Sequence, residues 1–291
     1  MISRVSPAYF TLILVWSTTA LSIKWGVTGL PFTFALMARF TLAALLALML
    51  LAWRRQSLPR HPAALTAYTI AGVATSISML CTFWASQFIN SGLVAVLFGL
   101  VPLATALFSR WILHTPLQKF DYIACGLGLA GLLTLFSQRI TLAPDGLIGI
   151  AALLVAVFLQ SAAAVLLKRH AGGQSPLAVN VGALLICALL STTFWLIAGA
   201  PSAETIPLRS AAAIIYLASV GSVLAFSLYY WLIRECRPIS VALISLITPA
   251  TSLWLGHTFN HEIIQRQEII GTGLILLGLV MYGLGMSRKG I

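Results

Sequence analysis

Acidic side chains are scarce in this sequence, and none of them lies in the middle of an apolar run. Asp and Glu together number six in 291 residues, and charged residues of both signs make up 8% of the chain. The six carboxylates lie at or beyond the ends of the apolar runs: Asp121, Asp145, Glu204, Glu235, Glu262 and Glu268. A proton-coupled drug pump usually holds a carboxylate inside the membrane, and an intramembrane aspartyl protease needs two. The scarcity therefore argues against both classes.

Motifs for catalysis and metal binding are lacking as well. The four cysteines show no CxxC spacing, and the chain contains no GxSxG, HExxH or ATP-binding motif. His257 and His261 have the i, i+4 spacing of a metal-binding pair, but the segment GHTFNHE around them is typical of a helix end and an outer loop. We expect no catalytic residue, no metal site and no cofactor, and hence no enzyme.

Apolar residues, by contrast, dominate the chain. Hydrophobic residues make up 60% of it and the mean hydropathy is +1.00, values outside the range of soluble domains. A membrane-spanning helix needs about 20 mostly apolar residues. Ten such runs occur, at 7–27, 31–53, 63–85, 91–113, 119–137, 146–168, 176–199, 209–232, 239–258 and 267–286. The sequence predicts an all-α integral membrane protein with ten transmembrane helices in the lipid bilayer.

The basic residues indicate how these helices are oriented. The net charge is +11, but Lys and Arg occur singly or in short groups between apolar runs, so we expect no nucleic-acid partner. With the N-terminus inside, twelve of the 17 Lys and Arg residues fall in cytoplasmic segments and four in outer ones. Positive charge concentrates in cytoplasmic loops. The distribution predicts a multi-pass protein of a bacterial inner membrane with both termini cytoplasmic, and we expect a monomer.

The chain also contains an internal repeat. At an offset of 147 residues, VAVLFGLVPLATALF pairs with VALISLITPATSLWL, which places Pro102 on Pro249. Over 91–132 and 238–279, eleven of 42 positions are identical. The sequence therefore predicts two five-helix repeats, residues 1–140 and 141–291. Because five is an odd number of spans, the second repeat is inverted relative to the first, as in secondary transporters that bind substrate near the membrane midplane.

Together these features resemble the drug/metabolite transporter superfamily, specifically its ten-helix EamA-like branch. The matching segments are VWST at 15–18, Arg39, the runs centred on Pro102 and Pro249, and the Gly-rich runs GLGLAG and GTGLILLG. Glu262 matches the acidic residue that the family usually carries after the ninth span. The VWST segment is also similar to the aromatic amino-acid exporters of this superfamily. The resemblance implies a secondary transporter of small metabolites.

Arg39 is the charged residue that lies deepest in a predicted span. It is about eight residues from the outer end of span 31–53, which is roughly 12 Å at 1.5 Å per residue. An ionised Arg at that depth must face protein, water or an anionic group. It either attracts the carboxylate of a substrate or binds the C-terminal carbonyls of a neighbouring helix. Lys24 and Lys168 lie near span ends, and we expect them to extend toward the lipid headgroups.

The other candidate substrate-binding residues are polar or aromatic side chains on spans that should face one another. Polar side chains in the membrane line a cavity or bond across helices. Aromatic side chains form stacking walls for an apolar substrate or belts at the membrane interface. These candidates are Trp16, Ser17, Phe83, Trp84, Phe98, Gln160, Tyr229 and Tyr230.

Pro102 lies near the middle of a predicted span. Proline lacks a backbone N–H and disturbs the carbonyl four residues earlier, here that of Phe98. Lipid would not tolerate such a break, whereas a water-lined cavity would. We therefore expect the break to turn Phe98 and Gly99 toward the substrate path and to serve in gating, although a plain packing kink is the other interpretation. The equivalent residues of the second repeat are Ser245, Thr248 and Pro249.

The sequence thus predicts an exporter of small metabolites that works by alternating access around a central cavity. Amino acids with aromatic or other hydrophobic side chains fit a core without carboxylates best, and such a small molecule is the expected partner. A second hypothesis is an exchanger of phosphorylated sugars or nucleotide-sugars, which would need several inward Lys or Arg residues. A third is a membrane-embedded scaffold or enzyme that transports nothing.

Overall fold

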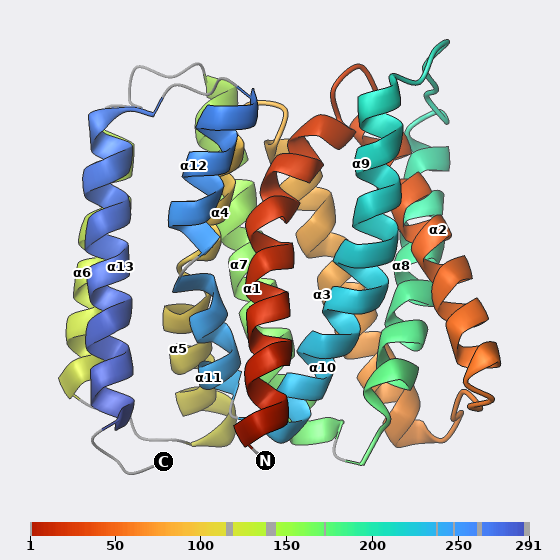
Figure 1. Cartoon of the computed structure of the whole chain (residues 1–291), viewed down its shortest axis with the longest axis horizontal. Helices are drawn as coiled ribbons and strands as arrows, with labels where there is room; N and C mark the ends of the chain where they lie inside the picture. The colour runs from red at the N-terminus through yellow and green to blue at the C-terminus, as the bar shows by residue number, and fades with distance from the viewer. Residues whose placement is uncertain are drawn as a thin grey trace.

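The computed structural model describes residues 2–114, 119–137, 144–171, 173–236, 238–246, 248–260 and 264–287, and within them it contains helices and no strands. The predicted repeat boundary at residues 140 and 141 lies outside the described residues. The helices run side by side in one bundle (Figure 1). They are α1 (Ile2–Gly26), α2 (Phe32–Trp53), α3 (Pro62–Ala85), α4 (Ser91–Phe98), α5 (Val101–Leu113), α6 (Lys119–Ser137), α7 (Pro144–His170), α8 (Pro176–Ile197), α9 (Leu208–Ala218), η2 (Ser219–Leu224), α10 (Ala225–Glu235), α11 (Pro238–Ala242), η3 (Leu243–Leu246), α12 (Thr248–Asn260) and α13 (Arg266–Ser287).

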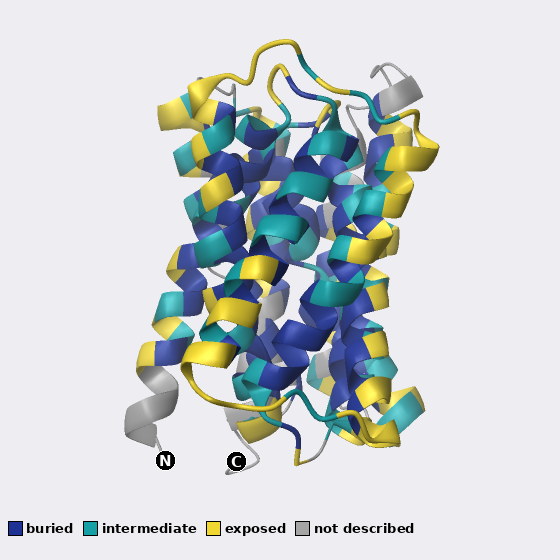
Figure 2. Cartoon of the chain, turned by 90° about the vertical axis from the view of Figure 1, so that its right-hand side faces the viewer, coloured by how far each residue is buried: buried dark blue, intermediate teal, exposed yellow. Residues whose placement is uncertain are grey.

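Among the described residues, six helical segments are long and apolar enough to cross a membrane by length and composition. They are 32–53, 62–85, 91–113, 146–170, 176–197 and 208–235. Large apolar side chains point outward from the bundle, among them Leu208 at 86% and Ile197 at 79% exposure. Figure 2 shows the exposed residues on the outer faces of the helices and the buried ones between them. An apolar exterior of this kind is compatible with lipid. The helices are compatible with it as well, because each one satisfies its backbone N–H and C=O groups internally.

Local sequence explains where several helices begin. Pro62 and Pro176 open α3 and α8, where a missing N–H costs nothing because the first turn has no internal acceptor. His61 caps α3 by accepting the N–H of Ala64 through Nδ1 at 3.3 Å. The C-terminal end of α5 also has a local cause: the residue after Leu113 is His114, whose backbone is left-handed with φ of 53°.

Three of the predicted spans are interrupted rather than continuous. The span 91–113 divides into α4 and α5 at Gly99 and Leu100, so that Pro102 lies in the first turn of α5. The span 239–258 consists of α11, the 3₁₀ helix η3 and α12, and Pro249 follows the first residue of α12; the side chain of Pro249 lies outside what the structure describes. The span 209–232 holds the π-helix η2 between α9 and α10, which is not among the predictions from the sequence.

The packing of the helices leaves α6 and α13 at one edge of the bundle, where they pack on each other (Figure 1). Glycines allow their close approach: a Cβ added to Gly131 would lie 2.6 Å from the carbonyl oxygen of Gly271, and one added to Gly278 would lie 2.8 Å from that of Ala124. In the rest of the bundle, α2 packs on α8 and α4 on α12, while α3 packs on α7 and α1 on both α9 and α10. The central helices therefore surround a shared interior, and no described residue of α6 or α13 lies in its lining.

Candidate functional site

A cavity of about 120 Å³ lies between the central helices. Its described lining comes from α1, α2, α3, α4, α5, α7, η2, α10, α11, η3 and α12. All three interrupted spans contribute to this wall. The cavity therefore forms where regular helix breaks off, which is where non-helical backbone is tolerated at membrane depth.

Seven of the residues singled out from the sequence line this cavity: Trp16, Arg39, Phe98, Gln160, Tyr229, Ser245 and Thr248. They come from α1, α2, α4, α7, α10, η3 and α12, so segments far apart in the sequence meet at one place. Trp16 and Tyr229 touch each other, with ring centroids 5.4 Å apart. Phe226 packs edge-on against Tyr229 at 6.4 Å and also lines the cavity. These rings form an aromatic wall made by Trp16, Phe226 and Tyr229.

Other candidates lie behind or beside the cavity rather than in its described lining. Ser17 accepts a hydrogen bond from Thr251 Oγ1 at 2.7 Å and thereby joins α1 to α12. Phe83 is fully buried against Arg39, and Gly99 lies in the turn between α4 and α5.

Two aromatic candidates lie elsewhere. Trp84 packs against Phe88 near the end of α3, with ring centroids 5.1 Å apart. Tyr230 stacks on Phe226 at 6.0 Å and lines a second cavity of about 90 Å³, which also borders Lys168 and Arg234.

Arg39 is 1% exposed and is one of the residues that line the cavity. Its Nε donates to Ser222 Oγ at 3.2 Å and its Nη1 to Met79 Sδ at 3.6 Å. The guanidinium carbon also lies 5.2 Å from the ring centroid of Phe40 and 5.6 Å from that of Phe83, distances at which rings attract a cation. Within the described residues no carboxylate and no backbone carbonyl binds it, so the charge lacks the helix-end partners considered from the sequence.

The π-helix η2 positions the serine that Arg39 contacts. Ser222 Oγ donates to the carbonyl of Leu217, five residues earlier, at 2.8 Å. Asn180 of α8 is fully buried, and its Nδ2 lies within hydrogen-bond distance of the carbonyls of Ser222 and Val223, at 3.3 and 2.9 Å. An extra residue in a helical turn leaves carbonyls without their usual donors, and the Asn180 amide supplies one. The contacts of Ser222 and Asn180 are not among the predictions from the sequence, although the amide of Asn180 within an apolar run was a visible signal.

Two polar atoms of the cavity lining have no hydrogen-bond partner among the described residues: Thr105 Oγ1 and Gln160 Oε1. Thr105 lies on α5 and is fully buried, and Gln160 lies on α7, which packs on α5. Thr105, like Met79, is a lining residue that was not singled out from the sequence. A threonine in an apolar run more often bonds its own helix, so nothing local marks this one as unpaired.

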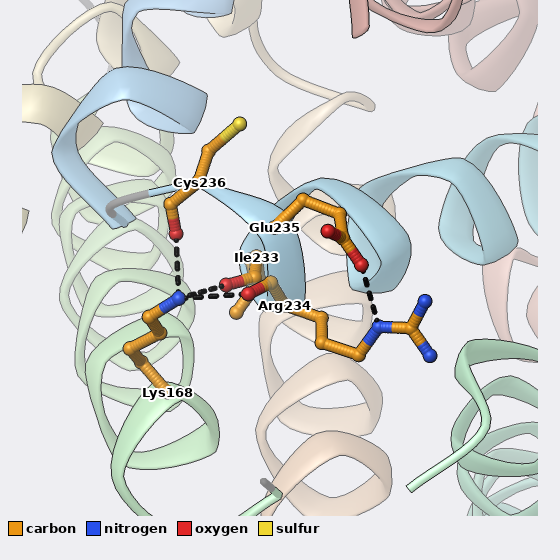
Figure 3. Close-up of polar contacts among 5 residues, drawn as sticks. All are labelled: Lys168, Ile233, Arg234, Glu235 and Cys236. Atoms are coloured by element: carbon orange, nitrogen blue, oxygen red, sulfur yellow. Dashed lines mark hydrogen bonds and ion pairs between the residues drawn. The ribbon is translucent and has the colours of Figure 1, made fainter. Parts of the chain in front are cut away.

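Lys24 and Lys168, which we expected to extend toward the headgroups, bind backbone carbonyls of neighbouring segments. Lys24 Nζ donates to the carbonyls of Ser86 at 2.5 Å and Ile89 at 3.2 Å, just beyond α3. Figure 3 shows Lys168 Nζ among three carbonyls at the end of α10. It donates to the carbonyls of Ile233 at 3.1 Å, Arg234 at 2.9 Å and Cys236 at 2.9 Å. A cation at a helix C-terminus neutralises the carbonyls that have no internal donor.

Comparisons with known proteins agree with this architecture. A model of the EamA-like transporter family matches residues 7–137 and 147–284. YedA of Escherichia coli (strain K12), described as an uncharacterized inner membrane transporter, is 28% identical over 284 residues, which cover 96% of this chain and 90% of YedA. YoaV of Bacillus subtilis (strain 168), described as an uncharacterized transporter, is 22% identical over 289 residues, which cover 98% of this chain and 99% of YoaV. One solved crystal structure has the same fold, with a TM-score of 0.73 and 22% identity over 99% of both chains.

Proposed function

This chain belongs to the EamA-like transporter family, and from that premise we propose that it is a secondary transporter which exports small metabolites bearing a carboxylate. Amino acids with aromatic or other hydrophobic side chains are the proposed substrates. The transporter is proposed to work by alternating access around the cavity, as a monomer in a bacterial inner membrane with both termini cytoplasmic.

The observation that carries this proposal is the state of Arg39. A guanidinium has five N–H donors, and two of those of Arg39 have acceptors among the described residues, Ser222 and Met79. A buried cation in an apolar setting is costly unless an anion or polar groups surround it. A carboxylate accepts two N–H bonds from one guanidinium in parallel. A substrate carboxylate in the cavity would therefore complete the surroundings of this charge.

The remaining lining supports a substrate with an apolar side chain. The aromatic wall of Trp16, Phe226 and Tyr229 borders the same cavity as Arg39, and Phe98 lies on its lining too. Aromatic walls bury large area and favour offset or edge-on contact with a substrate ring. This combination of one cation with aromatic walls fits an aromatic or aliphatic amino acid.

The same observations disfavour a sugar phosphate as substrate. A phosphate requires several cations to neutralise it, and the described lining of the cavity offers Arg39. The ammonium groups of Lys24 and Lys168, the other two candidates, bind backbone carbonyls instead. A scaffold that transports nothing would leave both the cavity and its buried charge unexplained.

Pairs of equivalent contacts support the proposed inverted repeat. At the offset of 147 residues, Ser86 and Ile89, which bind Lys24, correspond to Ile233 and Cys236, which bind Lys168. The same offset relates Gly131 to Gly278 and Ala124 to Gly271, so the two close contacts of α6 with α13 are equivalent as well. A two-fold relation of this kind gives two arrangements of similar energy, one open to each side, as alternating access requires. Pro102 and Pro249 begin the second halves of the broken helices that would flex between them.

Counterflow in proteoliposomes tests the proposal. We expect vesicles loaded with unlabelled L-phenylalanine to take up labelled L-phenylalanine, L-tryptophan or L-leucine, and to ignore labelled glucose 6-phosphate. The Arg39→Gln protein should lose at least ~10-fold in uptake, because a charged hydrogen bond to the carboxylate disappears.

Arg54→Gln is the matched control, since Arg54 is exposed and follows the last residue of α2. Uptake by the Arg54→Gln protein should equal that of the unaltered protein. Elution of each variant as a single peak in size-exclusion chromatography would show that it is folded. Absence of counterflow with every amino acid, or exchange of glucose 6-phosphate instead, would refute the proposed substrate class.

A further inference from the structure

Most hydroxyl groups that line the cavity are already satisfied by the protein. Four of them donate to backbone carbonyls three or four residues earlier in the chain, at 2.7 to 3.3 Å: Thr19, Thr82, Ser245 and Thr248. Each of these hydroxyls has placed its proton on a backbone carbonyl, so no unmet donor remains among the four. Their presence in the lining therefore says little about what the cavity binds.

Thr105 and Gln160 differ from these four because their oxygens have no partner among the described residues. The usual acceptor of Thr105 is the carbonyl of Val101, one turn earlier, and that carbonyl accepts the Ser161 hydroxyl at 3.2 Å. Leaving a buried polar atom unpaired is unfavourable, because the atom loses its hydrogen bonds to water on burial. Two such atoms, on packed helices and on one cavity lining, point to a ligand group that satisfies both.

The chemistry of these atoms defines that ligand group. Gln160 Oε1 is an acceptor, and the Thr105 hydroxyl is a donor that also accepts. The Phe98 carbonyl lacks the N–H that residue 102 would provide if it were not proline, and Phe98 lines the same cavity. A primary ammonium has three N–H donors and could donate one to each of these three oxygens, with the Thr105 hydroxyl acting as an acceptor.

We propose that Thr105 and Gln160 form the subsite for the α-ammonium group of the substrate, opposite in role to Arg39. This inference rests on the proposed function and extends it from a carboxylate-bearing substrate to a zwitterion held at both ends. The carboxylate binds Arg39 on α2, the ammonium binds between α5 and α7, and the side chain lies along the aromatic wall of Trp16, Phe226 and Tyr229. The two charged ends thereby bridge elements of both predicted repeats.

A panel of ligands that differ in one group tests this subsite. L-phenylalanine, 3-phenylpropanoate and L-3-phenyllactate share a ring and a carboxylate, and they carry an ammonium, a hydrogen and a hydroxyl at the α carbon. We expect the purified full-length protein in nanodiscs to bind L-phenylalanine at least ~10-fold more tightly than the other two, the range for hydrogen bonds to a charged group. Thr105→Val and Gln160→Leu should each reduce this preference, and the double variant should reduce it to within about threefold.

Thr82→Val is the matched control, because Thr82 lines the same cavity but its hydroxyl donates to the Ser78 carbonyl at 2.7 Å. Its preference ratio should equal that of the unaltered protein. Since each ratio is taken within one variant, a general loss of affinity cancels. Equal binding of phenyllactate, or a preference that survives the double variant, would overturn the subsite even where L-phenylalanine counterflow persists. Failure of all three ligands to bind, together with absent counterflow, would overturn the proposed function itself.

Discussion

Three charged residues in the apolar helices have different surroundings, although each was visible in the sequence. Arg39 borders the cavity and contacts side chains, whereas Lys24 and Lys168 bind backbone carbonyls. Because a charge within an apolar run is rare and costly, its position could be predicted. The partners of the charge could not be predicted. Arg39 and Ser222 are 183 residues apart in the sequence, and a hydropathy pattern does not indicate which distant residues come into contact.

The contacts of Lys168 predict a measurable contribution to stability. Replacing it in Lys168→Met removes the cation from three carbonyls at the end of α10. We expect a loss of about 1–2 kcal/mol, the upper range for a cation at a helix C-terminus. Thermal unfolding of the purified protein in detergent would show this as a lower Tm.

Lys119→Met is the control for that measurement, since Lys119 is exposed at the first position of α6. Lys168→Arg keeps the charge and should recover part of the lost stability. If Lys168→Met and Lys119→Met unfold at the same temperature, the carbonyl contacts contribute nothing, and headgroup contact would be the better description of Lys168.

At the scale of the helix, hydropathy predicted where apolar segments run but not how they break. The division at Gly99 could be predicted because proline has a known effect on the helix before it, and the structure begins α5 at Val101. The π-helix at Ser219–Leu224 could not be predicted, since its residues are as apolar as regular helix. What stabilises it is Asn180 on another helix, and a tertiary partner of that kind leaves no local pattern.

The close packing of α6 on α13 predicts that a larger side chain between them lowers stability. An alanine at Gly131 or Gly278 would place Cβ 2.6 or 2.8 Å from a carbonyl oxygen of the facing helix, and backbone cannot move aside as a flexible side chain would. We expect Gly131→Ala and Gly278→Ala each to lower stability by about 1–3 kcal/mol, as overpacking does elsewhere. The midpoint of thermal unfolding in detergent measures this loss.

Each of these two helices provides its own control. Gly126 of α6 and Gly273 of α13 have no atom within 4 Å of an added Cβ, and alanine favours helix over glycine by about 1 kcal/mol. Gly126→Ala and Gly273→Ala should therefore leave the midpoint unchanged or raise it. A midpoint for Gly131→Ala as high as that of Gly126→Ala would mean that α6 and α13 do not pack as closely as the structure has them.

At the scale of the whole molecule, the distribution of charged loops over the two ends of the bundle predicts its orientation in the membrane. The ends of the bundle where α1 begins and α13 ends lie on one face (Figure 1). The loop between α2 and α3 lies on that face too, and it carries Arg54, Arg55 and Arg60. The loop between α8 and α9 lies on the opposite face and contains no Lys or Arg between residues 198 and 207. Cytoplasmic loops concentrate positive charge, so the face with α1 and α13 should be cytoplasmic.

Two serines in these loops allow a direct test of that orientation. Ser57 and Ser202 are both exposed, and each would be changed to cysteine in a protein whose four native cysteines have been replaced. In intact cells a membrane-impermeant maleimide should label Ser202→Cys and should reach Ser57→Cys after the inner membrane is permeabilised. Because the two sites share residue type and exposure, a difference in labelling reports the side of the membrane. The opposite pattern would invert the bundle, place the Arg-rich loop outside and reverse the direction in which the cavity must open for export.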